Sequence, residues 1–437
     1  MSWLHFFETK TEQRHQFGRG INAIVNEKEE ELFNKSYEAF EEKNILQAYE
    51  YFFSSLENFS NHASNQNIVT RKEDEKLFFE IFQGCARISG YVTDEHLYAE
   101  SILTRKSLAN VGLKRYILER NYQLTFTNYF SDSEYIKIKL YHDNLTMSPQ
   151  KIFFPLRELA LNADYDKEFT RSEFPDVLLE DIEHVKALDE KELLIKYESL
   201  HQWIDEIEEK IKTFPSNDNA GMQAFSYLYL YFKIDYLLVP KYDMSQKMNK
   251  KVHEYFSDEN SLIEAKNEEL KEHVEVLKSM QFDEFKKKFY NAKYTFNPSD
   301  RTPQEEINLF IKESLTKIRW YKNNRYTQII PIIYKYIAFY TLYNYGLHPV
   351  TKELLHTLVE VQNPEFFSKL DYPTLYKEET NSFSKRAIIS RIESIIAPHK
   401  ERFKLLEPFG GKLNYSTLNE FSNSFYLQLQ NLNFEEI

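Results

Sequence analysis

The hydrophobic pattern of the chain changes its period near residue 77, and this change decides the fold class. Upstream, "LFNKSYEAFEEKNILQAYEYFFSSLENF" within residues 21–60 has helical spacing with a break near Lys43 and Asn44, which predicts a helical hairpin. Downstream, the apolar residues of "YIKIKL" (135–140) alternate with lysines. Such alternation is typical of a strand with one buried and one solvated face. The chain therefore predicts an α+β fold in its first half.

Beyond the change of period, the predicted order is two or three strands, a helix, two strands and a closing helix. The first strands lie in "LFFEIFQGCARISGYVT" and "HLYAESILTR", with Gly84 and Gly90 at bends or bulges. "NVGLKRYILERN" has helical spacing, and "QLTFTNYF" and "YIKIKL" alternate around the hairpin loop "SDSE". Ser148 and Pro149 begin the closing helix, which runs through "LRELALNA" and which Pro155 should kink or start later.

Residues 77–170 resemble YbjN-like bacterial proteins, which share the fold of class I type III secretion chaperones. The resemblance covers about a fifth of the chain. Its landmarks are a strand pair ending in "LYAES", the "NVGLKRYILERNY" helix and an "SP" helix ending in "LALNAD". None of these is a catalytic signature. The resemblance implies a small α/β sandwich that often dimerises and binds protein segments without turning over a substrate.

A partner surface is expected in the same region. Its candidate residues come from the 111–120 helix and from two predicted strands: Leu113, Tyr116, Ile117, Tyr98 and Phe126. Homodimer formation through the 111–120 helix or through a sheet edge would fit the resemblance. The charged residues between positions 90 and 122 then lie on the solvent-exposed faces of the strands and the helix and do not form an active site.

The rest of the chain is predicted to be helical. "LLEDIEHVKALDEKELLIKYESLHQWIDEIEEKIKTF" predicts one or two acidic helices, "AGMQAFSYLYLYFKIDYLL" a nearly all-apolar helix, and residues 246–290 charged amphipathic helices. Pro298 and Pro303 mark the clearest domain boundary, and a helical array of poorly similar units is one alternative for residues 304–437. The predicted domains are a helical hairpin, an α+β domain and two helical domains: residues 1–70, 71–175, 176–297 and 298–437.

Charge and composition exclude several classes of function. A net charge of -13 opposes nonspecific binding to nucleic acid or anionic membranes, since both need a basic protein surface.

The N-terminus lacks the pattern of a signal peptide, and Pro331 and Lys335 make the apolar stretch 329–347 a buried helix rather than a membrane span. Cys85 is the sole cysteine, so no intrachain disulfide can form. We expect a cytoplasmic protein.

No pattern in the sequence predicts a catalytic, metal or cofactor site. "GRGINA" fits only the loosest dinucleotide fingerprint and follows no strand, which favours a helix-start loop. His142 beside Asp143, and His253 beside Glu254, lack the spacing of two metal ligands on one helical face. Cys85 is better explained as a small core residue than as a nucleophile. A distant pair of carboxylates converging into a catalytic dyad stays open.

Phenylalanine and tyrosine are unusually frequent in this chain, with 35 Phe and 31 Tyr against 9 Gly. Most of them should form the core, including Phe78, Phe79 and Phe82. Tyrosine and phenylalanine are also favoured at interfaces, where an acidic rim would suit apolar or basic partner segments. We therefore expect a non-enzymatic protein-binding adaptor or chaperone-like protein without cofactors. Two alternatives remain: a structural subunit of a larger assembly, and an enzyme with a site between the α+β and helical domains.

Overall fold

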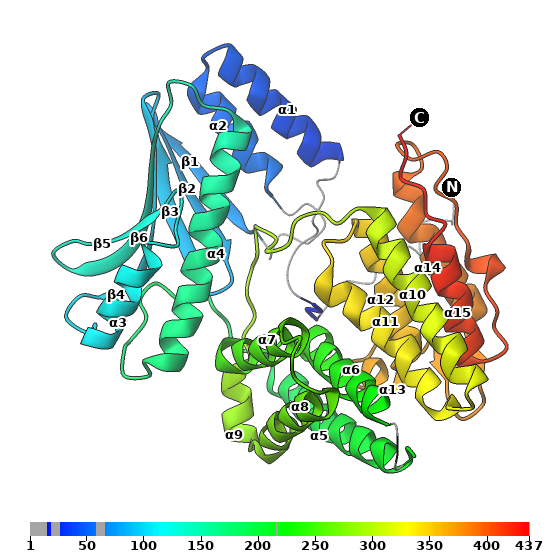
Figure 1. Ribbon diagram of the computed structural model, residues 1–437. Coiled ribbons are helices and arrows are strands. Elements are labelled where there is room, and N and C mark those ends of the chain that lie inside the picture. The colour runs from blue at the N-terminus through cyan, green and yellow to red at the C-terminus, as the bar shows by residue number, and fades with distance from the viewer. Residues whose placement is uncertain (1–14, 19–26, 58–65, 216, 218, 437) are drawn as a thin grey trace.

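The computed structural model describes residues 15–18, 27–57, 66–215, 217 and 219–436. A unit of sheet and helices comes first, and a large group of helices follows it (Figure 1). This arrangement confirms the α+β class with a large helical region that the sequence predicts.

One six-stranded antiparallel sheet organises the first unit, in the strand order β1-β2-β3-β4-β6-β5. Gly84, with φ of 56°, turns the chain between β2 and β3, and the predicted "SDSE" loop joins β5 to β6. Helix α3 is inserted between β4 and β5, as predicted. The strands are β1 (Ile68–Glu73), β2 (Lys76–Gln83), β3 (Ala86–Val92), β4 (His96–Arg105), β5 (Asn128–Ser131) and β6 (Tyr135–Asp143).

Both edge strands differ from the sequence prediction. The sequence predicts the first strand only from residue 77, and so it does not predict β1. β1 shows no alternation, because all of its residues except Ile68 are exposed at the edge of the sheet. At the other edge the sequence predicts a strand over 123–130, whereas pairing with β6 begins only at Asn128. The backbone N–H groups of residues 125–127 bind the Glu158 carboxylate instead of a neighbouring strand.

Helices cover one face of this sheet (Figure 1). They are α1 (Glu27–Glu41), α2 (Ile45–Ser55), α3 (Val111–Arg120) and α4 (Pro149–Glu173). α1 and α2 form the predicted hairpin, with Lys43 at a φ of 61° between them. Phe53 of α2 stacks on Phe79 of β2 with 4.4 Å between ring centroids. Pro155 is buried inside α4, and the helix neither starts nor ends there.

Gly90 of β3 is closely packed on the covered face. An ideal Cβ at this position would lie 2.2 Å from the Tyr98 carbonyl oxygen and 2.5 Å from Cζ of Phe79. The first of these contacts is to backbone, so a side-chain rotation cannot relieve it.

Replacing Gly90 by alanine is therefore expected to lower the free energy of unfolding by about 1–3 kcal/mol through overpacking. Amide hydrogen exchange of peptides from β2, β3 and β4 should become faster. Ser89→Ala, one residue away on the opposite face, is the matched control and should leave exchange unchanged. Equal exchange in the two variants would show that the sheet tolerates a side chain at position 90.

The remaining helices build a single apolar core to which residues on both sides of position 297 contribute. α6 and α11 lie at its centre, where Tyr229 meets Phe339 at 5.9 Å between ring centroids. Residues 330–344 form the buried helix that the apolar stretch predicts. The helices are α5 (Glu190–Lys212), α6 (Ala220–Leu238), α7 (Tyr242–Ser257), α8 (Ile263–Ser279), α9 (Phe282–Phe285), α10 (Gln304–Asn323), α11 (Ile330–Asn344), α12 (Pro349–Gln362), α13 (Pro364–Lys369), α14 (Lys385–Ile396) and α15 (Leu418–Leu429). Within the described residues, no helix combines the length and the apolar content needed to cross a membrane.

Two parts of the region predicted as helical have another structure. The acidic stretch 178–214 contains one helix, in agreement with the predicted one or two, and this helix begins at Glu190, where the Asp189 side chain accepts the N–H of Lys191 at 3.1 Å. Residues before it run along the sheet instead, and the Thr104 hydroxyl donates to the carbonyl of Leu178 at 2.6 Å. In the C-terminal region a two-stranded ribbon, β7 (Tyr376–Lys377) with β8 (Ser382–Phe383), interrupts the helices.

The segment 290–296 ties the helical region to the sheet. The N–H of Gly84 donates to the carbonyl of Lys293 at 2.8 Å. The Gln83 side-chain oxygen accepts the N–H groups of Thr295 and Phe296 at 3.0 and 2.8 Å. Phe296 is buried in the same core as the sheet.

Candidate functional site

The sheet has a covered face and an open face. The helices α2, α3 and α4 share one apolar core with the side chains of the covered face, such as Leu77 and Ile138. Alternation along the strands sends the neighbouring side chains to the other side of the sheet. These residues define the open face: Phe78, Glu80, Arg87, Ser89, Tyr91, Tyr98, Glu100, Ile102, Lys137, Lys139 and Tyr141.

Four aromatic residues form a line across the open face. The strand register pairs Phe78 with Tyr91, Tyr91 with Tyr98, and Tyr98 with Tyr141. We call these four residues the aromatic row. Ring centroids are 6.2 Å apart for Phe78 and Tyr91 and 5.7 Å apart for Tyr91 and Tyr98. His96 of β4 lies beside the row, with its ring centroid 5.6 Å from that of Tyr91 and 5.4 Å from that of Tyr141.

The aromatic row is open to solvent along its length. Tyr141 is 63% exposed, and the other three side chains are half-buried. Cross-strand aromatic pairs stabilise a sheet, yet burying these rings completely would stabilise the chain further. Aromatic side chains left accessible on a flat surface are typical of a protein interface.

Charged groups flank the row on both sides. The Arg71 guanidinium lies 5.6 Å from the centroid of the Phe78 ring, and the Lys76 ammonium lies 5.2 Å from that of Tyr91. The Tyr98 hydroxyl donates to the Glu100 carboxylate at 2.6 Å. Burial, together with this hydrogen bond, raises the pKa of Tyr98, so the hydroxyl stays neutral and able to donate. The face therefore offers ring surfaces, cations and a carboxylate side by side.

Beside the row, the open face is hollowed near the end of β4. A hollow of about 460 Å³ is lined by Arg87, Ile102, Tyr135, Glu180, Asp181 and Glu183. The Lys167 ammonium fixes its outer wall, since it donates to the carbonyls of Glu180 and Asp181 at 3.0 Å each. Asp181 in turn forms an ion pair with Arg87 of β3. The acidic wall would favour a basic group in a bound segment.

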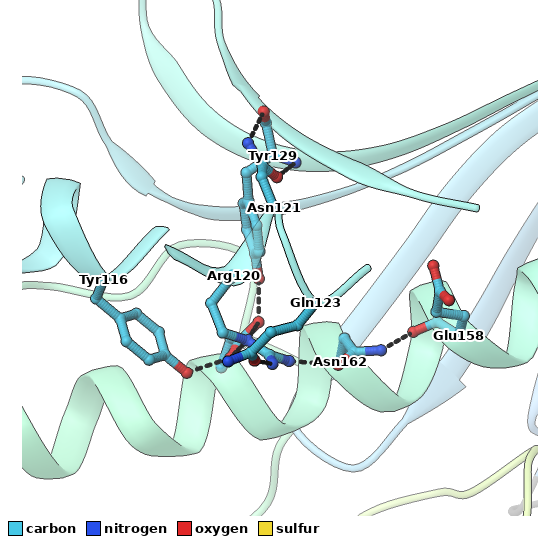
Figure 2. Close-up of polar contacts among 8 residues, drawn as sticks. Tyr116, Arg120, Asn121, Gln123, Tyr129, Glu158 and Asn162 are labelled. Carbon is cyan, nitrogen blue, oxygen red and sulfur yellow. Dashed lines mark hydrogen bonds and ion pairs between the residues drawn. The ribbon is translucent and has the colours of Figure 1, made fainter. Parts of the chain in front are cut away.

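A buried carboxylate, Asp166 of α4, fixes α3 and β5 in place behind this face. Its partners Tyr116, Arg120 and Tyr129 are labelled in Figure 2. It accepts hydrogen bonds from the hydroxyls of Tyr116 and Tyr129 at 2.5 and 2.7 Å. Arg120 Nε donates to the same carboxylate at 2.9 Å, and the Arg120 guanidinium also contacts Asn162. Burial raises the pKa of Asp166, while Arg120 and the two tyrosines act against this rise. Because each partner is satisfied by another protein group, the network is a structural anchor.

Glu158, two turns earlier in α4, holds the loop that precedes β5. Its carboxylate accepts the backbone N–H groups of Thr125, Phe126 and Thr127 at 3.0, 2.8 and 2.9 Å. Figure 2 shows Glu158 one turn from Asn162, whose amide donates to the Glu158 carbonyl at 2.8 Å. The loop therefore lies on the α4 side of the sheet.

The structure does not bring the five predicted surface residues together. Leu113 and Ile117 are buried against the covered face, and Tyr116 is held by Asp166. Phe126 is 49% exposed, but it lies in the loop bound by Glu158. Tyr98 alone belongs to the aromatic row. A partner could reach Leu113 and Ile117 only if α3 moved.

Sequence reasoning missed most of the row. Phe78 is predicted as core together with Phe79, whereas the structure buries Phe79 and leaves Phe78 on the open face. The alternation within β2 could have placed Phe78 on the solvent side of the strand, since Phe78 shares a face with Glu80. Tyr91 and Tyr141 join the row only through the register of the sheet. Register is a tertiary property that one sequence does not display.

Cys85 lies in the turn between β2 and β3, not in the predicted strand, and it meets polar groups of α4. Its backbone N–H donates to Asp164 Oδ1 at 2.8 Å. One turn along α4, Glu168 accepts the Tyr290 hydroxyl at 2.6 Å. Burial, followed by the charges of Asp164 and Glu168, raises the pKa of the Cys85 thiol. A thiol held in this form is a poor nucleophile.

The Asp164 carboxyl makes a testable contribution to stability. Burial, and then the charge of Glu168, raises the pKa of Asp164 to about 7. Aspartate in an unfolded chain has a pKa of about 3.9, so the folded chain binds the Asp164 proton more tightly than the unfolded chain does. The resulting stability is fully present below the unfolded pKa and is lost as the pH rises through about 7.

We therefore expect the wild-type chain to lose about 1 kcal/mol of stability between pH 6 and pH 8 through this group. Asp164→Asn keeps an oxygen that can accept the Cys85 N–H and should remove this part of the pH dependence. Urea unfolding of both proteins at the two pH values measures the difference. Identical pH dependence in the two proteins would refute the assignment.

The other chemical candidates do not assemble into a centre. Among the residues that the structure describes, no group of three or more His, Cys, Asp and Glu side chains could hold a metal ion. The "GRGINA" stretch lies outside the described residues apart from Gly18. The chain matches no protein-family model and no curated protein.

Proposed function

We propose that this chain is a non-enzymatic adaptor or chaperone-like protein whose open face binds a segment of a partner protein. The aromatic row is the observation that carries the proposal. It places four aromatic side chains in line on a rigid sheet, and the helices that pack on the sheet lie on its other face. A few residues near the centre of an interface carry most of its binding energy, and tyrosine is enriched among them.

The dimensions of the row suit a short segment. Four strands spaced about 4.8 Å apart give a row about 14 Å long. That length matches about four residues of extended chain or about three turns of helix. The acidic wall formed by Glu180, Asp181 and Glu183 lies at one side of the row and favours a segment with a basic residue near its apolar anchors.

The resemblance to YbjN-like proteins supports the same class of function and remains a prediction. A cytoplasmic location and a homodimer remain predictions with it. In this proposal the helical region serves as a scaffold that holds the sheet through α4 and the segment 290–296.

Site-specific photocrosslinking tests the proposal. A photoreactive phenylalanine analogue at position 98 should crosslink to a partner protein in native cells, because Tyr98 lies in the middle of the row. The same analogue at position 122 is the control, since Tyr122 is 93% exposed but lies beyond the end of α3. Crosslinks from position 122 and none from position 98 would contradict the proposal. Substrate turnover by the purified chain would favour the enzyme alternative.

A further inference from the structure

The segment 15–18 lies in an aromatic pocket of the helical region. Phe17 is only 6% exposed. Its ring centroid lies 5.1 Å from His356 of α12, 5.3 Å from Phe367 of α13 and 5.9 Å from Tyr372. Three elements remote from the N-terminal segment thus surround one phenylalanine side chain.

The next residue, Gly18, is bound through its backbone. Its N–H donates to the carbonyl of Tyr236 at 2.8 Å. Gly18 has a φ of 71°, and an ideal Cβ there would lie 2.8 Å from Cε2 of Tyr236. Both the backbone angle and the missing space require glycine. The pocket therefore accepts a phenylalanine followed by a glycine.

The walls of the pocket are held by contacts of their own. The Tyr236 hydroxyl lies 2.9 Å from His356 Nδ1, and His356 Nε2 lies 3.4 Å from the Glu360 carboxylate. Burial lowers the pKa of His356 to about 3, so the ring is neutral and can accept the tyrosine proton at Nδ1. Arg391 pairs with Glu360 behind it. These contacts join residues of the helical region to one another and do not involve Phe17.

We propose that this pocket is a recognition site for a Phe-Gly pair in a short segment of a partner protein, and that residues 15–18 occupy it as an internal competitor. One anchoring ring beside one backbone hydrogen bond is how many domains bind short peptides. A site that is filled from within shows a weaker apparent affinity until the internal segment is displaced. This site lies on the helical region and is independent of the open face.

Peptide binding to the full-length chain tests this proposal. The probe is a fluorescein-labelled peptide with the sequence of residues 11–20, TEQRHQFGRG, followed by fluorescence anisotropy. Phe17→Ala empties the pocket, and this variant should bind the peptide at least about tenfold more tightly than the wild-type chain. Peptides in which the phenylalanine or the glycine is replaced by alanine should not bind.

Three controls keep the result decisive. Circular dichroism establishes that the Phe17→Ala chain is folded, and Gly18→Ala releases the same segment by a second route. A folded variant that does not bind the peptide, or equal binding by variant and wild type, would overturn the proposal. Loss of folding in both variants would overturn it too, because the segment would then be structural. Light scattering that shows a wild-type dimer and a Phe17→Ala monomer would assign the pocket to a second copy of the chain instead.

Discussion

Replacing Asp166 by alanine is expected to lower the free energy of unfolding by about 3–5 kcal/mol, because one partner of a buried ion pair is removed. The Arg120 side chain is 12% exposed and would keep its charge without a carboxylate beside it. The hydroxyls of Tyr116 and Tyr129 would lose their acceptor at the same time. Urea unfolding measures the loss, and amide exchange of α3 and β5 locates it.

Two comparisons separate this effect from a general loss of charge. Asp166→Asn keeps the size of the side chain and one acceptor oxygen, so it should cost less than the alanine variant. Glu134→Ala removes a carboxylate from an exposed pair with Arg105, whose charged atoms are 3.9 Å apart, and should destabilise the chain far less than Asp166→Ala. If Asp166→Ala were no more destabilising than Glu134→Ala, the anchoring role of Asp166 would be wrong.

The double variant Tyr91→Ala/Tyr98→Ala is expected to bind the crosslinked partner about 1,000-fold less tightly than the wild-type chain. Each ring is an anchor at the centre of the row, and truncating a central aromatic anchor commonly costs about 2 kcal/mol of binding energy. Both side chains point away from the core, so the fold should be retained. Isothermal titration calorimetry measures the affinity, and circular dichroism tests the fold.

Tyr122→Ala is the matched control for that experiment. It removes a tyrosine of the same kind from an exposed position off the row, and the affinity should not change. A similar loss of affinity in both variants would mean that the open face has no special part in binding.

Local patterning was sufficient to predict much of the sheet unit. The alternation of "YIKIKL" is visible because β6 has helices on one side and solvent on the other. Helix α3 follows from the spacing of Leu113 and Ile117, and the Asn110 side chain caps it by accepting the N–H of Leu113 at 2.8 Å. The start of α4 follows from Ser148 and Pro149.

The parts that could not be predicted depend on contacts between distant residues. β1 carries no periodic signal because an edge strand is exposed on several sides. Asp166 and Tyr129 are separated by 37 positions, and Phe17 and Phe367 belong to opposite ends of the chain. The aromatic row likewise needs four strands in register before its residues become neighbours.

Hydroxyl-radical footprinting with and without the partner tests most directly whether the open face is the binding surface. Oxidation of Phe78, Tyr91, Tyr98 and Tyr141 should fall in the complex, because these side chains would be covered. Oxidation of Tyr122 should stay the same in both samples. Unchanged oxidation of the aromatic row, with protection elsewhere on the chain, would contradict the proposed function.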